Sequence, residues 1–293
     1  MIAVDLGSNT IRFTEFDGVY WGKSFEKIVR TAESLQNTNR ISDLALHRII
    51  DAINDAKSYI DFSHQSVVAY TTAAMRLASN SQDIIDKIKT ETGIVFHIIT
   101  ADKEAELTLS AVRYRLNRLA LEPESFLLVD IGGGSTEFIE NTPNGARSVS
   151  LNMGIVTLAE SVIYEAQLWE KIQLFQSKIK DSLSLSRTLP LVLTAGTPTT
   201  IAAYLNGMDY ESYDPKKING YVLSLGDCYR VHDDLLGMDE ASRTRYVGVG
   251  RENLIIAGIL MVTSIYDVFH VQEAIIIDDG LREGIALEYY KLY

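Results

Sequence analysis

The sequence predicts an α/β protein that contains two related domains. Along the 293 residues, short apolar runs with the character of β-strands alternate with longer stretches of helical period. This alternation is typical of α/β proteins rather than of sandwiches or helical bundles. The second observation is an internal repeat, because residues 4–13 (VDLGSNTIRF) align without a gap with residues 129–138 (VDIGGGSTEF). A repeat of this kind indicates two domains of common design, each contributing one turn to a shared site.

The expected strands are short and mostly apolar. In chain order they cover residues 2–4, 11–16, 66–70, 95–99, 126–131, 136–140, 191–194 and 274–277. The expected helices are longer stretches in which apolar residues recur at helical spacing. In chain order they cover about residues 42–60, 80–92, 102–119, 155–184, 197–205, 226–236, 252–266 and 280–290.

A proline-bearing segment marks the expected domain boundary. Pro123 lies in the sequence LEPES, at residues 121–125, between a helix and a strong strand. Proline in such a segment is typical of a turn between elements. We therefore expect one domain at residues 1–122 and a second at residues 123–293. The final helix is apolar and rich in tyrosine, so we expect it either to pack back on the first domain or to form the contact of a homodimer.

Charge and composition limit the partners that the chain suits. It carries 27 basic and 39 acidic side chains, a formal net charge of −12. Such a chain lacks the basic surface that non-specific nucleic-acid binding needs, so we expect no nucleic-acid partner, and an anionic substrate would need a local site. Cys228 is the only cysteine, which excludes an intrachain disulfide and fits a reducing compartment.

The hydropathy of the chain argues against a membrane protein. The longest apolar run, at residues 254–265, is too short to cross about 30 Å of hydrocarbon. The first residues also lack the basic region and long apolar stretch of a signal peptide. We therefore expect a soluble cytoplasmic protein with no membrane partner.

Each copy of the repeat contains a turn of small polar residues directly after a strand that ends in Asp. The turns are GSN, at residues 7–9, and GGGS, at residues 132–135. Small residues expose backbone N–H groups with no bulky Cβ in the way, which suits a concave nest around a phosphate. A single such turn would more often be an ordinary hairpin, since Gly and Asn are common turn residues. Two of them, each preceded by Asp, favour phosphate binding.

The second turn is expected to bring two carboxylates together. If it spans residues 132–135, Asp130 lies opposite Glu137 and both side chains point to one face. Adjacent like charges destabilise a strand pair unless a cation, a proton or a basic group intervenes. Mg²⁺, bound through one or two carboxylates with waters and phosphate oxygens, would remove the conflict. In the first copy Arg12 lies opposite Asp5, and a plain structural ion pair explains that pair equally well.

A third segment of small residues, at 193–200 (LTAGTPTT), follows another apolar strand. Thr197 is suited to the N-cap of the next helix and Pro198 to its first position. A helix N-terminus can hold an anion, although capping alone explains the sequence about equally well.

The two turn motifs resemble the phosphate motifs of the exopolyphosphatase / guanosine pentaphosphate phosphatase (Ppx/GppA) family, a branch of the actin-like, sugar-kinase-like fold. The motifs are DxGSNxxR from Asp5 and DxGGGSxE from Asp130. The similarity extends through further segments along almost the whole chain. These are residues 27–30, 70–80, 99–107, 195–197 and the DGLREG sequence at 279–284.

The resemblance implies two ribonuclease-H-like domains with mixed sheets flanked by helices and an interdomain cleft. It implies a hydrolase that uses Mg²⁺ or another divalent cation to release terminal orthophosphate from inorganic polyphosphate, from guanosine pentaphosphate, or from both. The implied metal ligands are Asp5, Asp130 and Glu137. The implied phosphate-binding residues are Gly7, Ser8, Asn9, Arg12, Arg76, Gly132, Gly133, Gly134, Ser135, Gly196 and Thr197.

The implied catalytic carboxylates are Glu104, which would activate the attacking water, and Glu137. Phosphoryl transfer asks for such a residue, since the protein mainly positions a water and neutralises charge. Without the motif, Glu104 and the nearby Asp102 read as acids favoured by the dipole at a helix start. Three arginines on the same helix, Arg113, Arg115 and Arg118, could follow a polyphosphate tail, although a charged helix end is the more common explanation.

The chain departs from the family pattern at several positions. Glu106 stands where the family has arginine, TAESL at residues 31–35 replaces the glycine-bearing LGEGL, and REN at 251–253 stands where R-A-D is usual. These changes leave substrate affinity and chain-length preference open. The chain also lacks the additional helical domains of longer members, which favours short polyphosphates or a guanosine tetra- or pentaphosphate.

Two other functions remain open on the sequence. One is an ATP-dependent enzyme of the same fold, which would need an adenosine pocket near Gly196. The other is a polyphosphate- or nucleotide-binding regulator without turnover, which the retained carboxylates oppose and the Glu106 substitution leaves open.

Overall fold

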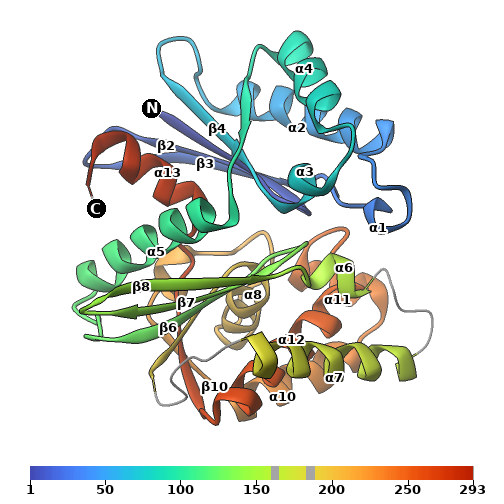
Figure 1. Cartoon of the computed structure of the whole chain (residues 1–293), viewed down its shortest axis with the longest axis vertical. Helices are drawn as coiled ribbons and strands as arrows, with labels where there is room; N and C mark the ends of the chain where they lie inside the picture. The colour runs from blue at the N-terminus through green and yellow to red at the C-terminus, as the bar shows by residue number, and fades with distance from the viewer. Residues whose placement is uncertain (160–164, 183–188, 293) are drawn as a thin grey trace. The chain divides into compact units, whose positions relative to one another are not determined.

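The computed structural model describes residues 1–159, 165–182 and 189–292, which form two compact units (Figure 1). Unit 1 consists of Met1–Ala111 together with Gly280–Tyr293, and unit 2 of Val112–Asp279. Each unit contains one mixed β-sheet flanked by helices. The protein is therefore a mixed α/β protein in which the chain enters unit 2 once and returns to unit 1 for its last helix.

The sheet of unit 1 has the order β3-β2-β1-β4-β5. Its strands are β1 (Ile2–Leu6), β2 (Thr10–Phe16), β3 (Trp21–Ile28), β4 (Val67–Thr71) and β5 (Phe96–Ile98). Strands β1, β2 and β3 are antiparallel, whereas β4 and β5 run parallel to β1. The central strand β1 is buried along its length, which explains its almost uninterrupted apolar sequence.

Two short helices, two longer ones and the beginning of a third long helix complete the first part of unit 1. They are α1 (Leu35–Thr38), α2 (Asp43–Tyr59), α3 (Ala73–Leu77), α4 (Ser81–Thr92) and the beginning of α5 (Ala101–Arg118). The hydroxyl of Ser42 accepts a hydrogen bond from the amide of Ala45, so α2 has a standard N-cap. Helix α4 ends at Gly93, whose left-handed backbone closes the helix.

The last helix, α13 (Leu281–Tyr290), packs against β1 and β2 within unit 1 (Figure 1). The ring of Tyr290 meets Phe16 edge to face at 5.5 Å between centroids, and the Tyr290 hydroxyl donates to the Phe16 carbonyl. Lys103 on α5 forms an ion pair with Glu288 on α13. Gly284 lies against the backbone of Leu107, where a Cβ on the glycine would stand 2.6 Å from the Leu107 carbonyl carbon.

The sheet of unit 2 repeats the order of the first and adds one strand. Its order is β10-β11-β9-β6-β7-β8, so β8, β7, β6, β9 and β11 take the places of β3, β2, β1, β4 and β5. The strands are β6 (Phe126–Ile131), β7 (Thr136–Thr142), β8 (Gly145–Leu151), β9 (Leu191–Thr194), β10 (Tyr221–Ser224) and β11 (Glu273–Ile276). The repeat seen in residues 4–13 and 129–138 therefore extends to the topology of both sheets.

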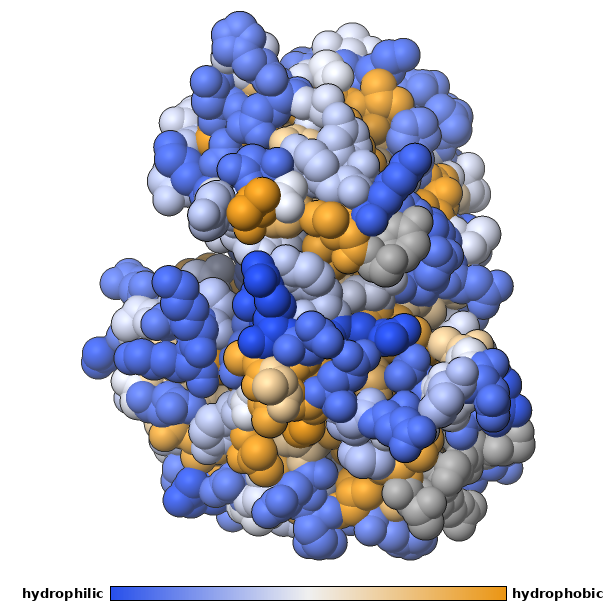
Figure 2. All heavy atoms as spheres, turned by 90° about the vertical axis from the view of Figure 1, so that its left-hand side faces the viewer, coloured by the Kyte–Doolittle hydropathy of each residue, from blue (hydrophilic) through white to orange (hydrophobic). Residues whose placement is uncertain are grey.

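The helices of unit 2 surround α12 (Ile255–Phe269), which is apolar on all sides and buried over most of its length. It packs against α7, α8, α10 and α6. The other helices are α6 (Ile155–Ala159), α7 (Glu165–Ser182), α8 (Gly196–Leu205), α9 (Pro215–Ile218), α10 (Leu225–Gly237) and α11 (Glu240–Val247). Within the described ranges, no helix is long and apolar enough to cross a membrane. On the face drawn in Figure 2, hydrophilic side chains are interspersed with smaller hydrophobic groups.

Several elements differ from the sequence expectation. Strands β3, β8 and β10 were not expected, because each lies at an edge of its sheet and carries polar or exposed residues instead of an apolar run. The single helix expected at 155–184 corresponds to α6 and α7, and residues 160–164 and 183–184 lie outside the described part of the chain.

The division into units also differs from the boundary expected at residues 122 and 123. It falls inside α5, between Ala111 and Val112, because the end of this helix and the residues after it contact unit 2. Arg115 forms an ion pair with Asp279 at 2.9 Å, and Leu119 lies close to Gly220. A helix that continues from one unit into the other carries no sequence signal of a boundary.

The close approach of α13 to α5 predicts the effect of one substitution. Gly284→Ala places a methyl group against the Leu107 backbone, so it should lower the free energy of unfolding by about 1–3 kcal/mol. Urea unfolding followed by circular dichroism measures this change. The control is Gly237→Ala, whose added Cβ meets nothing within 4 Å, and which should not destabilise the protein. Equal stabilities for the two variants would contradict the packing argument.

Candidate active site

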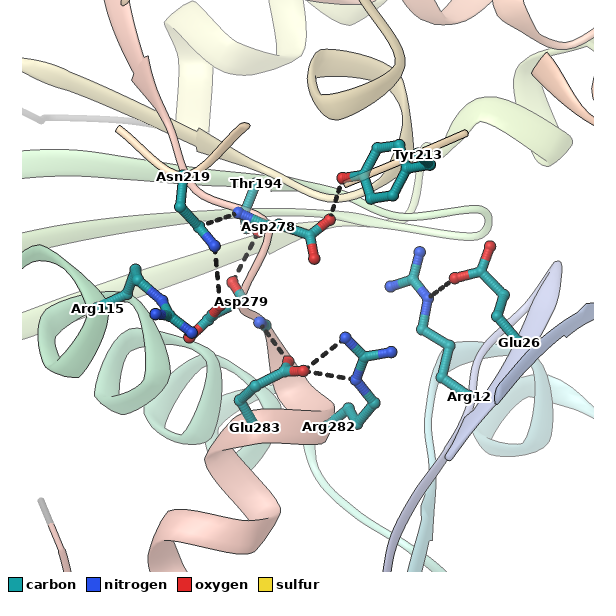
Figure 3. A network of polar contacts seen from close by, with 11 residues as sticks. Arg12, Glu26, Arg115, Thr194, Tyr213, Asn219, Asp278, Asp279, Arg282 and Glu283 are labelled. Carbon is teal, nitrogen blue, oxygen red and sulfur yellow. Dashed lines mark hydrogen bonds and ion pairs between the residues drawn. The ribbon is translucent and has the colours of Figure 1, made fainter. Parts of the chain in front are cut away.

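One group of candidate site residues lies in the hairpin formed by β1 and β2 in unit 1. Asp5 lies opposite Arg12, as the sequence predicted, and next to Tyr70 on β4. The Nε atom of Arg12 donates a hydrogen bond of 2.9 Å to Glu26 on β3 (Figure 3). Across β1, β2 and β3 the charges therefore run acidic, basic, acidic. Burial raises the pKa of the Tyr70 hydroxyl, and the negative charge of Glu288 raises it further.

The turn of this hairpin contains three residues expected to bind phosphate. The amide of Gly7 donates to the Thr10 carbonyl at 3.0 Å, which closes the turn. Ser8 is buried and Asn9 is partly exposed. The turn is compact enough to present backbone N–H groups to an anion.

A second group of candidate site residues lies in the equivalent hairpin of β6 and β7 in unit 2. Asp130 lies opposite Glu137 and Ile131 opposite Thr136, so the register that the sequence predicted for this hairpin is confirmed. Glu137 is only 3% exposed, and its Oε1 accepts a hydrogen bond of 2.8 Å from the hydroxyl of Ser150 on β8. The turn that carries Gly132, Gly133, Gly134 and Ser135 lies at the end of this carboxylate pair.

In each sheet, directly opposed residues on neighbouring strands form a row of side chains. The rows of the two sheets differ in charge, although the strands that carry them occupy equivalent places in the two sheets. Directly opposed residues across β9, β6, β7 and β8 are Thr194, Asp130, Glu137 and Ser150. Glu137 takes the position of Arg12 and Ser150 that of Glu26, so the row in unit 2 has two adjacent carboxylates flanked by hydroxyls. This row is therefore the one that a cation would stabilise.

The donor set suits a divalent cation that keeps part of its hydration. Within the described residues, no group of three or more His, Cys, Asp or Glu side chains is arranged to hold a metal ion. Asp130 and Glu137 supply two carboxylates, and Mg²⁺ typically binds one or two carboxylates together with waters and phosphate oxygens. The residues present therefore fit Mg²⁺ bound jointly with a phosphate, and fit a fully protein-enclosed ion poorly.

Glu104 lies in the first turn of α5 and is 9% exposed. The Nη1 atom of Arg76, in the last turn of α3, donates to Glu104 at 2.7 Å and to the carbonyl of Ile99 at 3.0 Å. The structure thus brings Glu104 and Arg76 together within unit 1. Because a guanidinium carries five N–H donors, these two bonds leave donors of Arg76 for a phosphate oxygen.

The unusual Glu106 has a partner one turn earlier on α5, the residue directly before Glu104. Lys103 contacts Glu106 at 3.0 Å and also forms the ion pair with Glu288 on α13. An arginine at position 106 would stand beside Lys103 as a second positive charge, so Glu106 and Lys103 form a consistent pair.

The third expected segment begins helix α8 earlier than the sequence predicted. Helix α8 starts at Gly196, and its N-cap is Ala195, so the N-cap assignment of Thr197 and the first-position assignment of Pro198 were wrong. Ala195 makes the early start through a φ of 78° and a ψ of −178°, a conformation rarely adopted outside glycine. Thr197 is buried against Gly258 of α12, and Arg251 lies close to Gly196.

The start of the DGLREG segment forms a polar network inside unit 2 (Figure 3). Asp279 is 3% exposed and accepts hydrogen bonds from Arg115 at 2.9 Å and from Asn219 at 3.4 Å. Its carbonyl accepts a bond of 3.0 Å from Thr194, the residue opposite Asp130. Arg115 therefore anchors a buried carboxylate, which favours a structural role for it over contact with a polyphosphate tail.

The rest of the segment caps α13 in unit 1. Glu283 accepts a hydrogen bond of 2.9 Å from the Gly280 amide and contacts Arg282 (Figure 3). Sequence reasoning did not single out Ser150 or Asn219, because the role of each depends on strands and loops that come together only in the folded chain. The position of Ser150 opposite Glu137 would have followed from recognising β8 as a third strand.

Five strands have the same order in both sheets, and each sheet has a turn of small residues after its first strand. These features define a member of the actin-like, two-domain class. The chain belongs to the Ppx/GppA phosphatase family, whose sequence pattern matches residues 23–292. The Aquifex aeolicus member of this family has a crystal structure that is 28% identical in sequence, with a TM-score of 0.76 over 98% of this chain and 96% of that one. A solved exopolyphosphatase from Cytophaga hutchinsonii shares the fold with a TM-score of 0.84 at 23% identity, over 99% of this chain and 97% of that one.

Two curated relatives match most of the chain. A bifunctional 3-dehydroquinate synthase/phosphatase from Fusobacterium nucleatum is 25% identical over 98% of this chain, which spans only 46% of that relative's length. Exopolyphosphatase 2 from Mycobacterium tuberculosis is 26% identical over 97% of both chains.

The backbone of Ala195 gives a prediction about stability. Ala195→Gly should raise the free energy of unfolding by about 1 kcal/mol, because glycine adopts this conformation without the cost that a Cβ brings. Ala203→Gly in the middle of α8 is the matched control and should lower stability by about 1 kcal/mol or more. Chemical denaturation of both variants measures the difference, and a destabilised Ala195→Gly protein would argue against strain at this position.

Proposed function

We propose that the protein hydrolyses a terminal phosphoanhydride and releases orthophosphate from inorganic polyphosphate. The observation that carries the proposal is the opposed pair of Asp130 and Glu137 beside the glycine turn in unit 2. Two adjacent carboxylates next to a turn of three glycines and a serine suit a divalent cation that is shared with a phosphate chain. Membership of the Ppx/GppA phosphatase family and the similarity to Exopolyphosphatase 2 support this reading.

We assign the metal to Asp130 and Glu137, with Mg²⁺ or another divalent cation as the ion. When bound, the cation would neutralise negative charge on the transferred phosphoryl group. Ser150 would hold Glu137 in place through its hydrogen bond. Asp5 lies beside Arg12 in a row whose charges already alternate, so we expect it to contribute less to metal affinity.

We assign water activation to Glu104. Its carboxylate would accept a proton from the water whose oxygen forms the new bond to the terminal phosphorus, while the bridging P–O bond breaks and the shortened chain departs. Arg76 would hold this carboxylate in one orientation through the bond of 2.7 Å. Its remaining donors would bind a phosphate oxygen of the substrate.

We propose short polyphosphates as the preferred substrates and guanosine pentaphosphate as a second one, because it presents the same terminal phosphoanhydride. The formal charge of −12 disfavours binding of a long polyanion outside the local site. Phosphate release from tripolyphosphate, long-chain polyphosphate, guanosine pentaphosphate and ATP separates these substrates from the ATP-dependent alternative. Release from ATP alone would contradict the proposal, and binding without release would favour a regulator.

The role of Glu104 predicts a specific loss of turnover. Glu104→Gln should lower kcat by about 10²–10⁴-fold, because the amide cannot accept the proton, while tripolyphosphate still binds. Phosphate-release assays measure kcat, and calorimetric titration measures the binding of tripolyphosphate. Asp102→Asn removes another acid from the same turn of α5 and should retain activity. If both variants lose activity equally, Glu104 is not the water-activating group.

The role of Glu137 predicts a change in metal dependence. Glu137→Gln should raise the Mg²⁺ concentration for half-maximal activity at least tenfold, and should weaken Mg²⁺ binding in calorimetry. Ser150→Ala should give a smaller shift in the same direction, because it removes only the bond that orients Glu137. Glu140→Gln is the control, since Glu140 lies on the same strand and pairs with Arg147. If Glu137→Gln leaves the Mg²⁺ titration unchanged, other residues bind the metal.

A further inference from the structure

The carbonyl groups of the first turn are held by one short segment of unit 1. Residues 29–32 follow β3 directly, and three of their amides point at the turn. The amides of Val29 and Arg30 donate to the Asn9 carbonyl at 2.8 and 2.9 Å, and the amide of Ala32 donates to the Ser8 carbonyl at 2.8 Å. These bonds fix the direction of two successive peptide groups in the turn.

The second turn is held in the same way in unit 2. The segment after β8 leads into α6, and the amide of Ile155 donates to the Gly132 carbonyl at 3.0 Å. The amides of Val156 and Thr157 donate to the Gly133 carbonyl at 2.8 and 3.3 Å. In each unit, therefore, the segment after the third strand supplies three amide donors to two carbonyls of the turn.

The geometry of the peptide bond converts this anchoring into a direction for the N–H groups. The chain contains no cis peptide bond among its described residues, and in a trans peptide the C=O and the following N–H point in opposite directions. The N–H groups of Asn9, Gly133 and Gly134 therefore point away from the anchoring segments. A reversed peptide would instead turn a carbonyl dipole toward the bound anion and repel it.

In unit 2 the anchoring segment can approach the turn only because position 154 is glycine. A Cβ on Gly154 would lie 2.5 Å from the Gly133 carbonyl oxygen and 2.6 Å from the Gly132 carbonyl oxygen, far inside van der Waals contact. Thr157 fixes the glycine itself, because its hydroxyl accepts from the Gly154 amide at 2.9 Å and donates to the Gly154 carbonyl at 3.0 Å. Any side chain at this position must push the segment off the turn.

In unit 1 a single arginine side chain fixes the anchoring segment. Arg48 on α2 donates from Nε to the Val29 carbonyl at 2.8 Å and from Nη2 to the Arg30 carbonyl at 3.4 Å. The same Nη2 forms an ion pair of 2.6 Å with Glu33. By donating to these carbonyls, Arg48 holds the segment in the orientation in which its amides point at the turn.

We propose that Gly154 and Arg48 are positioning residues that preset the two turns for phosphate, each acting through the segment that follows the third strand of its sheet. The inference rests on the proposed function, because it identifies the bound group as a phosphate of the substrate. Neither residue needs to touch the substrate. Each fixes the peptide orientation on which the backbone N–H donors depend.

The first test is Gly154→Ala with inorganic tripolyphosphate as the probe. We expect kcat/KM for phosphate release to fall by about 100-fold, the cost of roughly 1 Å of misplacement. Hydrogen exchange should show that tripolyphosphate protects the amides of residues 129–138 in the wild-type protein and fails to protect them in the variant. Gly237→Ala makes the same chemical change in open space in unit 2 and should behave as wild type.

A second variant covers the case in which Gly154→Ala does not fold. Thr157→Val keeps the side-chain shape but removes both bonds to Gly154, so it should raise KM and reduce the protection of residues 129–138 to a smaller extent. For unit 1, Arg48→Met should reduce the protection that tripolyphosphate gives to residues 4–13. Arg230→Met is the control, because Arg230 is an exposed arginine in an ion pair with Asp227 on α10.

The exchange readout separates this inference from the proposed function. If the wild-type protein releases no phosphate from any substrate but tripolyphosphate still protects both turns, the proposed hydrolase activity fails and the positioning role stands. If turnover is normal and the variants match their controls in KM and protection, the positioning role is overturned and the hydrolase stands. An absence of protection in an active wild-type protein would also overturn it.

Discussion

The opposed carboxylates of Asp130 and Glu137 are the constraint on which the candidate site depends. Folding of the β6–β7 hairpin places the two carboxylates side by side despite their electrostatic repulsion, because the turn length and strand register allow no other arrangement. The corresponding pair in unit 1, Asp5 and Arg12, has no such conflict. One duplicated framework thus carries two different charge patterns.

Much of this arrangement could be predicted from the sequence because it is local. The register of Asp130 with Glu137 follows from a turn of four residues. The similarity of residues 4–13 to 129–138 predicts that the sheet topology is repeated. Strands β3 and β8 escaped prediction, because edge strands need no apolar run. Because these two strands were not expected, the anchoring segments that follow them could not be predicted either.

Other features could not be predicted because they depend on contacts between distant parts of the chain. The glycines at 154 and 284 look ordinary in the sequence, and only the backbone that packs against each one explains the missing side chain. Thr197 has the composition of an N-cap, but the unusual backbone of Ala195 starts α8 earlier. The pairing of Arg76 with Glu104 likewise needs α3 and α5 to be brought together.

The packing of α13 on β1 and β2 has a consequence for the order in which the protein matures. Unit 2 is continuous in sequence, whereas unit 1 combines Met1–Ala111 with Gly280–Tyr293. During synthesis from the N-terminus, the strands of unit 1 emerge first but must wait for α13 to cover them. Apolar surface on β1 and β2 stays exposed throughout the translation of unit 2, so unit 2 is expected to become native first and chaperones to be needed most for the N-terminal sheet.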